Sequence, residues 1–383
     1  MNGTATHDER VAQEALGILS SDDVDERLFH RWTPTLYARF RVVIRGLVDG
    51  FRQETRQADA VHLAKRLLQA TPQTMHQLAV DPDFGRWVES IERILAKEVS
   101  SKRLPGLLAL LPRFVIAASI KDGWDLDLKV RMGAGGRARI PADGRVLQGP
   151  PGHQLRVVVE SGKLMNHTRV PRKVGGFEIV DGDASGGAIP RVEPLSGGAV
   201  FPCYRTLQKS VQVLEQTSPE MLTEAVALSP VLIPIRTDSP EVSHSAGLQS
   251  VRGGIWLSFP PNPLVVAETI IHEASHVLFH LIEDADPTVE EPDAKRFTVP
   301  WRTDQRPLRA VLMGYHAWVR IFGFLAKVSE PTRQQPAQER MAIIKEALDQ
   351  AEPILAQAQG YTAMGRAVCG LLAERHAEYR TLI

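Results

Sequence analysis

The chain has 383 residues, and its 45 Lys and Arg residues balance its 45 Asp and Glu residues, so the formal net charge is zero. This balance provides no global field that would attract nucleic acid or an anionic membrane, and we expect neither as a partner. The two cysteines, Cys203 and Cys369, lie far apart without metal-site spacing, which argues against a disulfide framework or a cysteine-type zinc site. The polar N-terminus lacks the apolar core of a signal peptide, and no apolar run of about 18 residues is available to span a bilayer. The sequence therefore predicts a soluble, cytoplasmic protein.

Residues 1–121 show the periodicity of a helical domain. Apolar side chains recur at intervals of three and four, as in a helical bundle, at Leu36, Phe40, Val43, Ile44 and Leu47 and again at Phe84, Trp87, Ile91 and Ile94. Pro34, Pro72 and Pro82 are expected to divide the helices. The apolar segment Leu104–Ile120 is predicted to be a buried helix at the end of this domain.

Residues 122–200 predict a small antiparallel β region. Apolar and charged residues alternate from Trp124 to Arg131, which is the period of a half-buried strand. An Asp143-Gly144 turn and further short apolar runs predict additional strands at Arg137–Ile140, Arg145–Leu147, Leu155–Glu160 and Phe177–Val180.

Residues 201–383 predict a mainly helical domain that carries the chemistry. Helices are expected from Tyr204 to Leu228, from Pro307 to about Lys327 and from Gln338 onward, with apolar strands at Val231–Ile235 and Gly253–Phe259. The loop Thr288–Arg306 is too long for a plain connection, which suggests a functional role. Taken together, the chain is predicted to be α+β and predominantly helical, with a helical bundle, a small antiparallel β region and a C-terminal helical metal-binding domain.

The segment from Asn262 to Pro287 contains the motif HExxH, at His272-Glu273-Ala274-Ser275-His276. Asn262 is a good N-cap residue, Pro263 suits the first turn, and apolar residues surround the motif, so a buried helix is expected. Histidines four apart share one helix face and can bind one metal ion. The alternative interpretation is a pair of core histidines with ordinary hydrogen-bond partners, but burying two imidazoles and a carboxyl group without a compensating partner is unfavourable. A strand directly before such a helix is typical of zincin-like folds, in which the strand edge pairs with an extended peptide.

A catalytic metal needs a third protein ligand, and the usual downstream patterns do not identify it. Phe279 and Ile282 occupy the positions that a metzincin fills with Gly and His, which excludes that class. Glu290 and Glu291 come early for the glutamate of a gluzincin and lie beside Pro292 in a loop, which leaves a weak case for that class. His280 lies about 12 Å from His272 along a helix, too far to share the ion easily. His316, on the next predicted helix, remains the candidate, and a three-histidine site accommodates zinc or iron.

Residues 250–325 resemble a known family. Three blocks occur in this order: His272-Glu273-x-x-His276, Phe297-x-x-Pro300-Trp301-Arg302-x-Asp304-x-Arg306-Pro307-Leu308 and Leu312-x-Gly314-x-His316-Ala317. In this combination the chain resembles the HExxH-domain proteins that are encoded beside ribosomally made peptide natural products. That family includes 2-oxoglutarate-dependent peptide β-hydroxylases. The resemblance is diffuse in the rest of the chain.

The resemblance implies non-haem Fe(II) and 2-oxoglutarate in place of zinc and water. His272 and His276 would then be iron ligands and His316 the third, whereas the role of Glu273 as ligand, base or supporting group stays open. Arg306 is our choice for the distal carboxylate of 2-oxoglutarate, since Arg offers a planar bidentate fork, with Arg302 as the alternative. Both arginines have a second interpretation as salt-bridge residues of the loop.

Three functions follow from these observations. The favoured one is a hydroxylase, a non-haem iron dioxygenase, that acts at the β-carbon of a residue in a ribosomally synthesised precursor peptide. The alternative is a zinc-dependent metallopeptidase in which Glu273 activates a metal-bound water and the Gly253–Phe259 edge aligns the peptide. A non-enzymatic peptide-binding protein with a degenerate metal site is the third. The sequence leaves open the precursor peptide, the modified residue and the formation of a homodimer.

Overall fold

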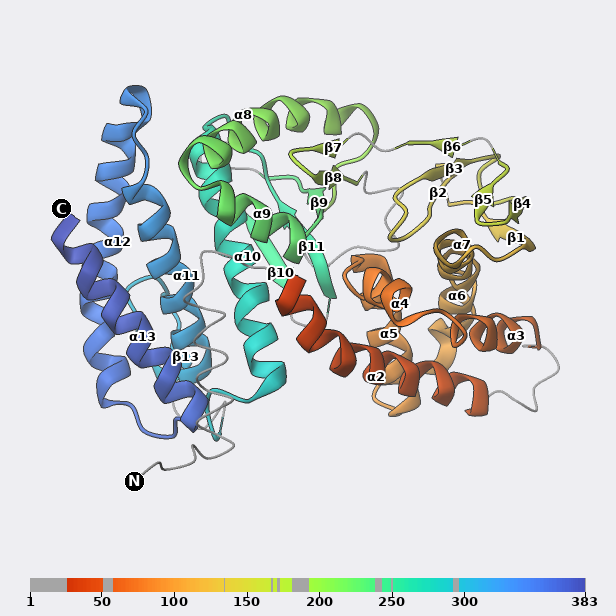
Figure 1. Cartoon of the computed structure of the whole chain (residues 1–383), viewed down its shortest axis with the longest axis horizontal. Coiled ribbons are helices and arrows are strands. Elements are labelled where there is room, and N and C mark those ends of the chain that lie inside the picture. The colour runs from red at the N-terminus through yellow and green to blue at the C-terminus, as the bar shows by residue number, and fades with distance from the viewer. Residues whose placement is uncertain are drawn as a thin grey trace. The chain divides into compact units, whose positions relative to one another are not determined.

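The computed structural model describes residues 26–50, 58–133, 135–166, 168–170, 173–180, 193–237, 243–248, 251–291 and 296–382, without the side chains of residues 26–37, 252, 285 and 382 (Figure 1). Helices predominate and are accompanied by small sheets, so the α+β, predominantly helical class predicted from the sequence is confirmed. The predicted helices at residues 1–25 lie outside the described residues.

The described residues divide into two compact units. The first contains residues 26–29, 209–225 and 262–382, and the second contains residues 30–208 and 226–261 with the gaps given above. These limits differ from the predicted boundaries at residues 121 and 200, because the segment that follows the β region returns to the second unit before the HExxH helix begins.

The helices of the second unit pack around an aromatic centre. They are α2 (Glu26–Gly50), α3 (Ala58–Leu67), α4 (Pro72–Ala79), α5 (Pro82–Leu95), α6 (Leu104–Leu108) and α7 (Leu111–Asp122). Phe84, Trp87 and Phe114 lie with ring centroids 5.1 to 6.0 Å apart and are fully buried. Pro72 and Pro82 each begin a helix as predicted. The prediction that Pro34 divides helices is wrong, because α2 runs through it, and the single helix predicted for Leu104–Ile120 is two.

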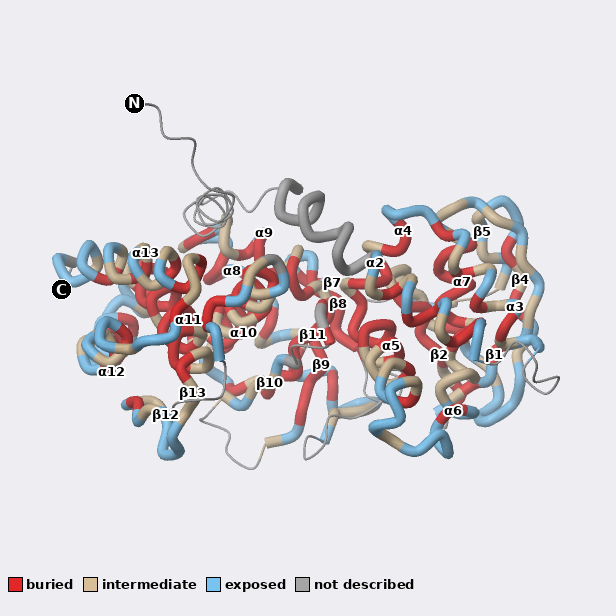
Figure 2. Tube along the Cα trace, turned by 90° about the horizontal axis from the view of Figure 1, so that it is seen from below, coloured by how far each residue is buried: buried red, intermediate tan, exposed pale blue. Residues whose placement is uncertain are grey.

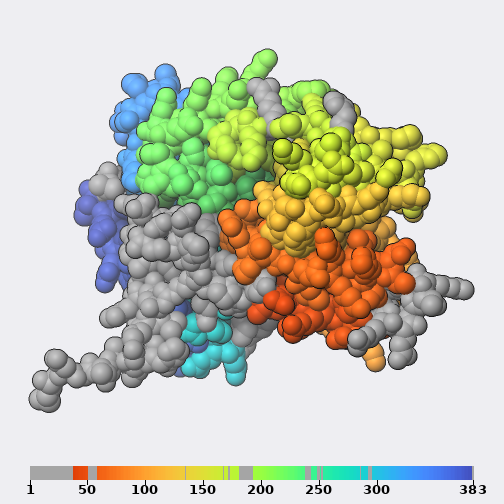
Figure 3. Space-filling view, turned by 45° about the vertical axis from the view of Figure 1, so that its right-hand side comes forward, coloured from red at the N-terminus to blue at the C-terminus, as the bar shows by residue number. Residues whose placement is uncertain are grey.

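Two three-stranded antiparallel sheets follow these helices. One has the order β1 (Leu126–Arg131), β4 (Gln154–Glu160) and β5 (Lys163–Leu164), and the other has the order β2 (Arg137–Arg139), β3 (Val146–Gln148) and β6 (Thr168–Arg169). The alternation from Trp124 onward thus predicted β1 within two residues. In Figure 3 the orange helical part and the yellow β part of this unit form a continuous packed surface.

The remaining sheet of this unit is mixed, because β9 (Val231–Pro234), which follows the predicted antiparallel region, adds parallel pairs to it. Its order is β10 (Ser245–Leu248), β11 (Val251–Leu257), β9, β8 (Phe177–Ile179) and β7 (Lys173–Val174). Strand β9 pairs in parallel with both β8 and β11, and the two outer pairs are antiparallel. Because β10 and β9 flank β11, the strand before the HExxH helix has no open edge for a peptide. The prediction of a substrate-aligning edge at Gly253–Phe259 is therefore wrong.

The double glycine of β11 has a packing reason. A Cβ atom on Gly253, whose φ is +78°, would lie 1.5 Å from the carbonyl oxygen of Val80, and one on Gly254 would lie 2.7 Å from the Cβ of Pro82. Only glycine permits the strand to approach the α4–α5 junction this closely.

A buried ion network joins α5 to the sheets of the second unit. The guanidinium of Arg139, on β2, donates to both carboxylate oxygens of Glu178 at 2.7 and 3.1 Å and to Asp81 at 2.7 Å. Arg139 is 2% exposed, and Asp81 is also the N-cap of α5, accepting from the backbone N–H of Asp83. Both carboxylates therefore receive hydrogen bonds from the single guanidinium of Arg139.

The first unit is built on four long helices. Helix α11 (Leu308–Ala326) packs against α10 (Pro263–Ala285) on one side and against α12 (Pro331–Gln357) and α13 (Ala363–Tyr379) on the other (Figure 1). Buried residues follow α11, whereas α12 and α13 keep exposed outer faces (Figure 2). Glu224 of α9 (Pro219–Leu228) forms a buried ion pair with Arg320 of α11, next to the end of α8 (Phe201–Thr217).

Among the described residues, two helical stretches are long and apolar enough to cross a membrane by length and composition, whereas the sequence predicted none. They are Ser101–Asp122, of which 50% of the most apolar window is buried inside the protein, and Pro263–Asp284, of which 72% is buried. Burial of this kind is found in the core helices of soluble proteins.

Candidate metal centre

Helix α10 begins and ends close to the predicted positions. The side chain of Asn262 accepts from the backbone N–H of Leu264 at 3.0 Å, Pro263 occupies the first turn, and the helix ends at Ala285. The N-cap bond satisfies one of the backbone donors that an α-helix leaves free at its N-terminus. The HExxH motif therefore lies in the middle of a regular helix and has a fixed backbone.

The imidazoles of His272 and His276 point to a common position. Their Nε2 atoms lie 2.9 Å apart, and the rings meet edge to face with centroids 4.4 Å apart. Both residues are intermediate in exposure, with most of their surface packed among protein atoms. This arrangement brings two ring nitrogens together on one helix face, as the spacing predicted.

Both imidazoles are held in the neutral form. Burial, with a smaller contribution from the positive charge of Arg340, lowers the pKa of His272 to about 4. Burial also lowers the pKa of His276 well below its ordinary value, and the neighbouring His272 and His280 act in the same direction. Neutral imidazole is the form that binds a metal, so protons do not compete for these nitrogens at neutral pH.

His316 lies on α11, the helix packed beside the motif, but does not complete a three-ligand set in this conformation. It is 1% exposed, its ring lies 5.8 Å from that of Phe279, and neither ring nitrogen has a hydrogen-bond partner among the described residues. Burial lowers its pKa well below the ordinary value, Arg320 and His276 act in the same direction, and the backbone of Ser275 acts in the opposite direction. Among the described residues, the ligand atoms of His272, His276 and His316 are not all within 4.8 Å of one another.

Two observations therefore bear on a metal ion. The Nε2 atoms of His272 and His276 are hydrogen-bonded to each other at 2.9 Å, and one ion could take the place of the shared proton. The unpartnered nitrogens of His316 and the unpartnered Nδ1 of His276 are buried polar atoms whose desolvation is uncompensated by hydrogen bonds. The assignment of His316 as the third ligand stays a prediction.

His280 is engaged elsewhere. A guanidinium N–H of Arg309 donates to its Nδ1 at 3.1 Å, and Arg309 also pairs with Glu283, which accepts from the hydroxyl of Thr288 at 2.7 Å. Because Nδ1 accepts a hydrogen bond, the neutral ring carries its proton on Nε2. His280 therefore offers no lone pair for the metal in this arrangement, in line with its exclusion on helix spacing.

Glu273 lies on α10 and is 4% exposed. Its position, one residue after His272, turns its side chain about 100° away from that histidine around the helix axis. The structure thus places the carboxyl group in the interior, and its role as ligand, base or supporting group stays open.

The two arginines chosen from the sequence share one acidic partner. Arg302 donates to Oδ1 of Asp304 at 2.9 Å, and Arg306 donates to Oδ2 of the same carboxylate at 3.1 Å. All three side chains are exposed, in the turn between β12 (Arg296–Phe297) and β13 (Arg306–Pro307). This arrangement agrees with the second interpretation of these arginines, as salt-bridge residues of the loop.

Aromatic rings connect this loop to the histidine pair. The ring of Trp301 lies 6.5 Å from that of Trp318 on α11, which lies 5.8 Å from the ring of His272. Gly314 makes room for the first contact, since a Cβ there would meet Nε1 of Trp301 at 3.0 Å. Residues of all three family-like blocks are therefore connected by contacts within one unit.

Two residues of this environment were missed from the sequence. Arg340, on α12, donates to the carboxylate of Glu268 at 3.0 and 2.6 Å, and its guanidinium lies 4.9 Å from the ring centroid of Trp318. Glu268 has a local signal, because it lies one helical turn before His272 on the same face. Arg340 comes from a distant helix and has no such signal.

Comparison with known proteins adds no relative. The chain matches no protein-family model, and no curated protein sequence matches it. The arguments about function therefore rest on the residues and their geometry.

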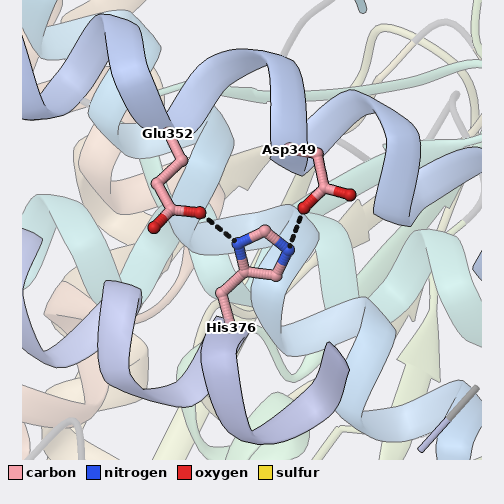
Figure 4. A group of neighbouring side chains, drawn as sticks. All are labelled: Asp349, Glu352 and His376. Atoms are coloured by element: carbon pink, nitrogen blue, oxygen red, sulfur yellow. Dashed lines mark hydrogen bonds and ion pairs between the residues drawn. The ribbon is translucent and has the colours of Figure 1, made fainter. Parts of the chain in front are cut away.

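A second cluster of possible ligand types, Asp349, Glu352 and His376, lies at the contact of α12 and α13 (Figure 4). His376 is fully buried, with Nδ1 3.1 Å from Glu352 and Nε2 3.4 Å from Asp349. Burial lowers the pKa of His376, and so does the nearby Arg380. The hydroxyl of Tyr315 lies 2.9 Å from Nδ1, which ties α11 to this cluster.

Cations of the protein already neutralise both carboxylates of this cluster. The guanidinium of Arg380 lies 2.6 Å from Asp349 and 2.5 Å from Glu352, and Lys345 lies 3.0 Å from Asp349. Although burial opposes it, hydrogen bonds from Lys345 and Arg380 lower the pKa of Asp349. A metal ion would have to displace Arg380, so we interpret the cluster as an ion network that holds three helices together.

Proposed function

We propose that the protein is a cytoplasmic Fe(II)- and 2-oxoglutarate-dependent hydroxylase that acts at the β-carbon of a residue in a ribosomally synthesised precursor peptide. The observation that carries the proposal is the His272 and His276 pair, two neutral imidazoles with Nε2 atoms 2.9 Å apart on a partly exposed helix face. Imidazole suits both iron and zinc, and the choice of iron rests on the family resemblance of residues 250–325.

The overall reaction balances without any further reactant. One atom of O2 enters the peptide C–H bond, the other enters the carboxyl group of succinate, and 2-oxoglutarate loses CO2. When bound, Fe(II) and the keto acid supply the oxidising power for this hydroxylation. The chain's own residues position these groups and limit the access of water.

Named residues have separate tasks in this proposal. His272 and His276 hold the metal, with His316 as the third ligand. Trp318 lies against His272 and Trp301 against Trp318, so the two indoles shield one side of the pair from solvent. The depressed pKa of His272 keeps its nitrogen available as a ligand across the neutral range.

The test begins with metal-free protein incubated anaerobically with Fe(II), 2-oxoglutarate and candidate precursor peptides, followed by addition of air. We expect succinate and a peptide heavier by one oxygen atom, with the His276→Ala variant inactive and the His62→Ala variant, changed at a histidine of the second unit, active. Peptide cleavage that needs zinc and no O2, and that is abolished by Glu273→Gln, would instead identify a metallopeptidase.

A further inference from the structure

The guanidinium of Arg340 is only partly used by the protein. Its Nε and Nη2 atoms donate to Glu268 at 2.6 to 3.2 Å, and its Nη1 makes no hydrogen bond to another described residue. An arginine side chain has five N–H donors in a planar fork, so one edge can hold a protein carboxylate while the other binds a second anion. Glu268 fixes the first edge of Arg340 and leaves the second available.

Arg340 lies beside the histidine pair and is accessible. Trp318 contacts both groups, with its ring centroid 4.9 Å from the Arg340 guanidinium carbon and 5.8 Å from the ring of His272. The side chain of Arg340 is 34% exposed, whereas that of Glu268 is 13% exposed. A small anion can thus reach the guanidinium from solvent, and the indole restricts the orientation of the guanidinium.

Four other arginines of this unit are already paired with carboxylates. Arg302 and Arg306 lie in an exposed turn and share the carboxylate of Asp304. Arg309 is bound by Glu283 and His280, and Arg320 is buried in an ion pair with Glu224. Of these arginines and Arg340, only Arg340 contacts Trp318, the aromatic ring that packs on His272.

We propose that Arg340 binds the anionic group of the small co-substrate used at the His272 and His276 pair. This inference rests on the proposed function, under which the anion is the distal carboxylate of 2-oxoglutarate. Glu268 holds the guanidinium in place, and Trp318 packs on both the guanidinium and the ring of His272. The assignment replaces Arg306, the residue chosen from the sequence.

The test compares two keto acids that differ in one carboxylate. Binding of 2-oxoglutarate and of 2-oxobutyrate to the Fe(II)-loaded protein is measured anaerobically by calorimetry, in wild type and in Arg340→Met. Loss of a charge-assisted bidentate contact should weaken 2-oxoglutarate binding by about 10- to 100-fold. Binding of 2-oxobutyrate, which lacks the distal carboxylate, should change by less than about threefold, and the peptide KM should not move.

Two matched variants provide the controls. Arg333→Met removes an arginine of the same helix that pairs with Glu330, and Arg306→Met removes the residue chosen from the sequence; both should bind 2-oxoglutarate like wild type. Since Arg340→Met leaves Glu268 without its partner, the double variant Glu268→Gln/Arg340→Met removes that charge and should bind 2-oxoglutarate as weakly as the single variant.

The outcomes separate the inference from the function on which it rests. Unchanged 2-oxoglutarate binding in both Arg340 variants, or equal weakening for both keto acids, overturns the role of Arg340 and leaves the proposed function intact. Weakening in Arg306→Met alone returns the role to Arg306. If the Fe(II)-loaded wild type binds neither keto acid, the proposed function fails and the inference fails with it.

Discussion

Replacing His316 with leucine should stabilise the metal-free protein and remove its response to metal. The side chain is 1% exposed, and neither ring nitrogen has a partner among the described residues. An unpartnered buried polar group costs about 1–3 kcal/mol, and a hydrophobic swap of similar volume costs under about 1.5 kcal/mol. His316→Leu should therefore raise the free energy of unfolding of the metal-free chain by about 1 kcal/mol.

The matched control is the same substitution at His376, which is equally buried but has partners in Tyr315 and Glu352. We expect His376→Leu to be destabilising, because it leaves Glu352 and Tyr315 without that partner. Urea unfolding of the three proteins, with and without Fe(II), gives the comparison. A ligand at 100 times its Kd stabilises by about 2.7 kcal/mol, and this increment should be present in wild type and largely absent in His316→Leu. A destabilised His316→Leu variant that keeps the full metal increment would refute the reasoning.

Three further predictions concern pH, the second unit and the aromatic contacts. The pKa of His272 is about 4 in the folded chain and 6.5 ordinarily, so the unfolded chain binds more protons between these two pH values. The free energy of unfolding of the metal-free protein should therefore fall by up to about 3 kcal/mol as pH drops from 6.5 to 4. Urea titrations of His272→Gln should show a smaller loss over the same pH range. Arg139→Met should lower the free energy of unfolding by about 3–5 kcal/mol in urea titrations, because it leaves Asp81 and Glu178 as buried charges. Arg156→Met, which removes only an exposed ion pair, should leave the free energy of unfolding nearly unchanged. Gly314→Ala should move Trp301 and reduce peptide hydroxylation by roughly 10-fold or less, because the added Cβ would meet the indole. Thermal stability should not fall, since alanine is a better helix former than glycine. Unchanged Trp fluorescence together with unchanged activity would contradict this prediction.

Short-range sequence patterns predicted the helices and strands that are determined by neighbouring residues. The alternation around Leu126 and Leu128 indicated β1, and the prolines at 72 and 82 marked helix starts because proline fits the first turn. The parallel pairing of β8 with β9 was not predictable in this way, because it joins segments separated by two helices and has no local signature. The double glycine at 253 and 254 signalled a close backbone approach, but its partner, the α4–α5 junction, is defined only by tertiary packing.

The candidate site follows the same division. Helix spacing alone predicted that His272 and His276 would converge, since the i, i+4 relation is a property of one helix. The partner of Arg306 depends on how the loop folds, and the contact of Arg340 with Trp318 depends on the packing of α12 against α11. A charged residue that approaches a site from a distant helix has no local sequence pattern that identifies it. For this reason the sequence favoured Arg306 and Arg302 of the loop, and not Arg340, for binding the distal carboxylate of 2-oxoglutarate.

The most direct test of the account is an anaerobic calorimetric titration of the metal-free protein with Fe(II), in wild type, His276→Ala and His376→Gln. The account predicts one ion per chain in wild type and in His376→Gln, and none in His276→Ala. A wild type that binds no ion, or a His276→Ala variant that still binds one while His376→Gln does not, would contradict it and would move the metal to the cluster of Asp349, Glu352 and His376.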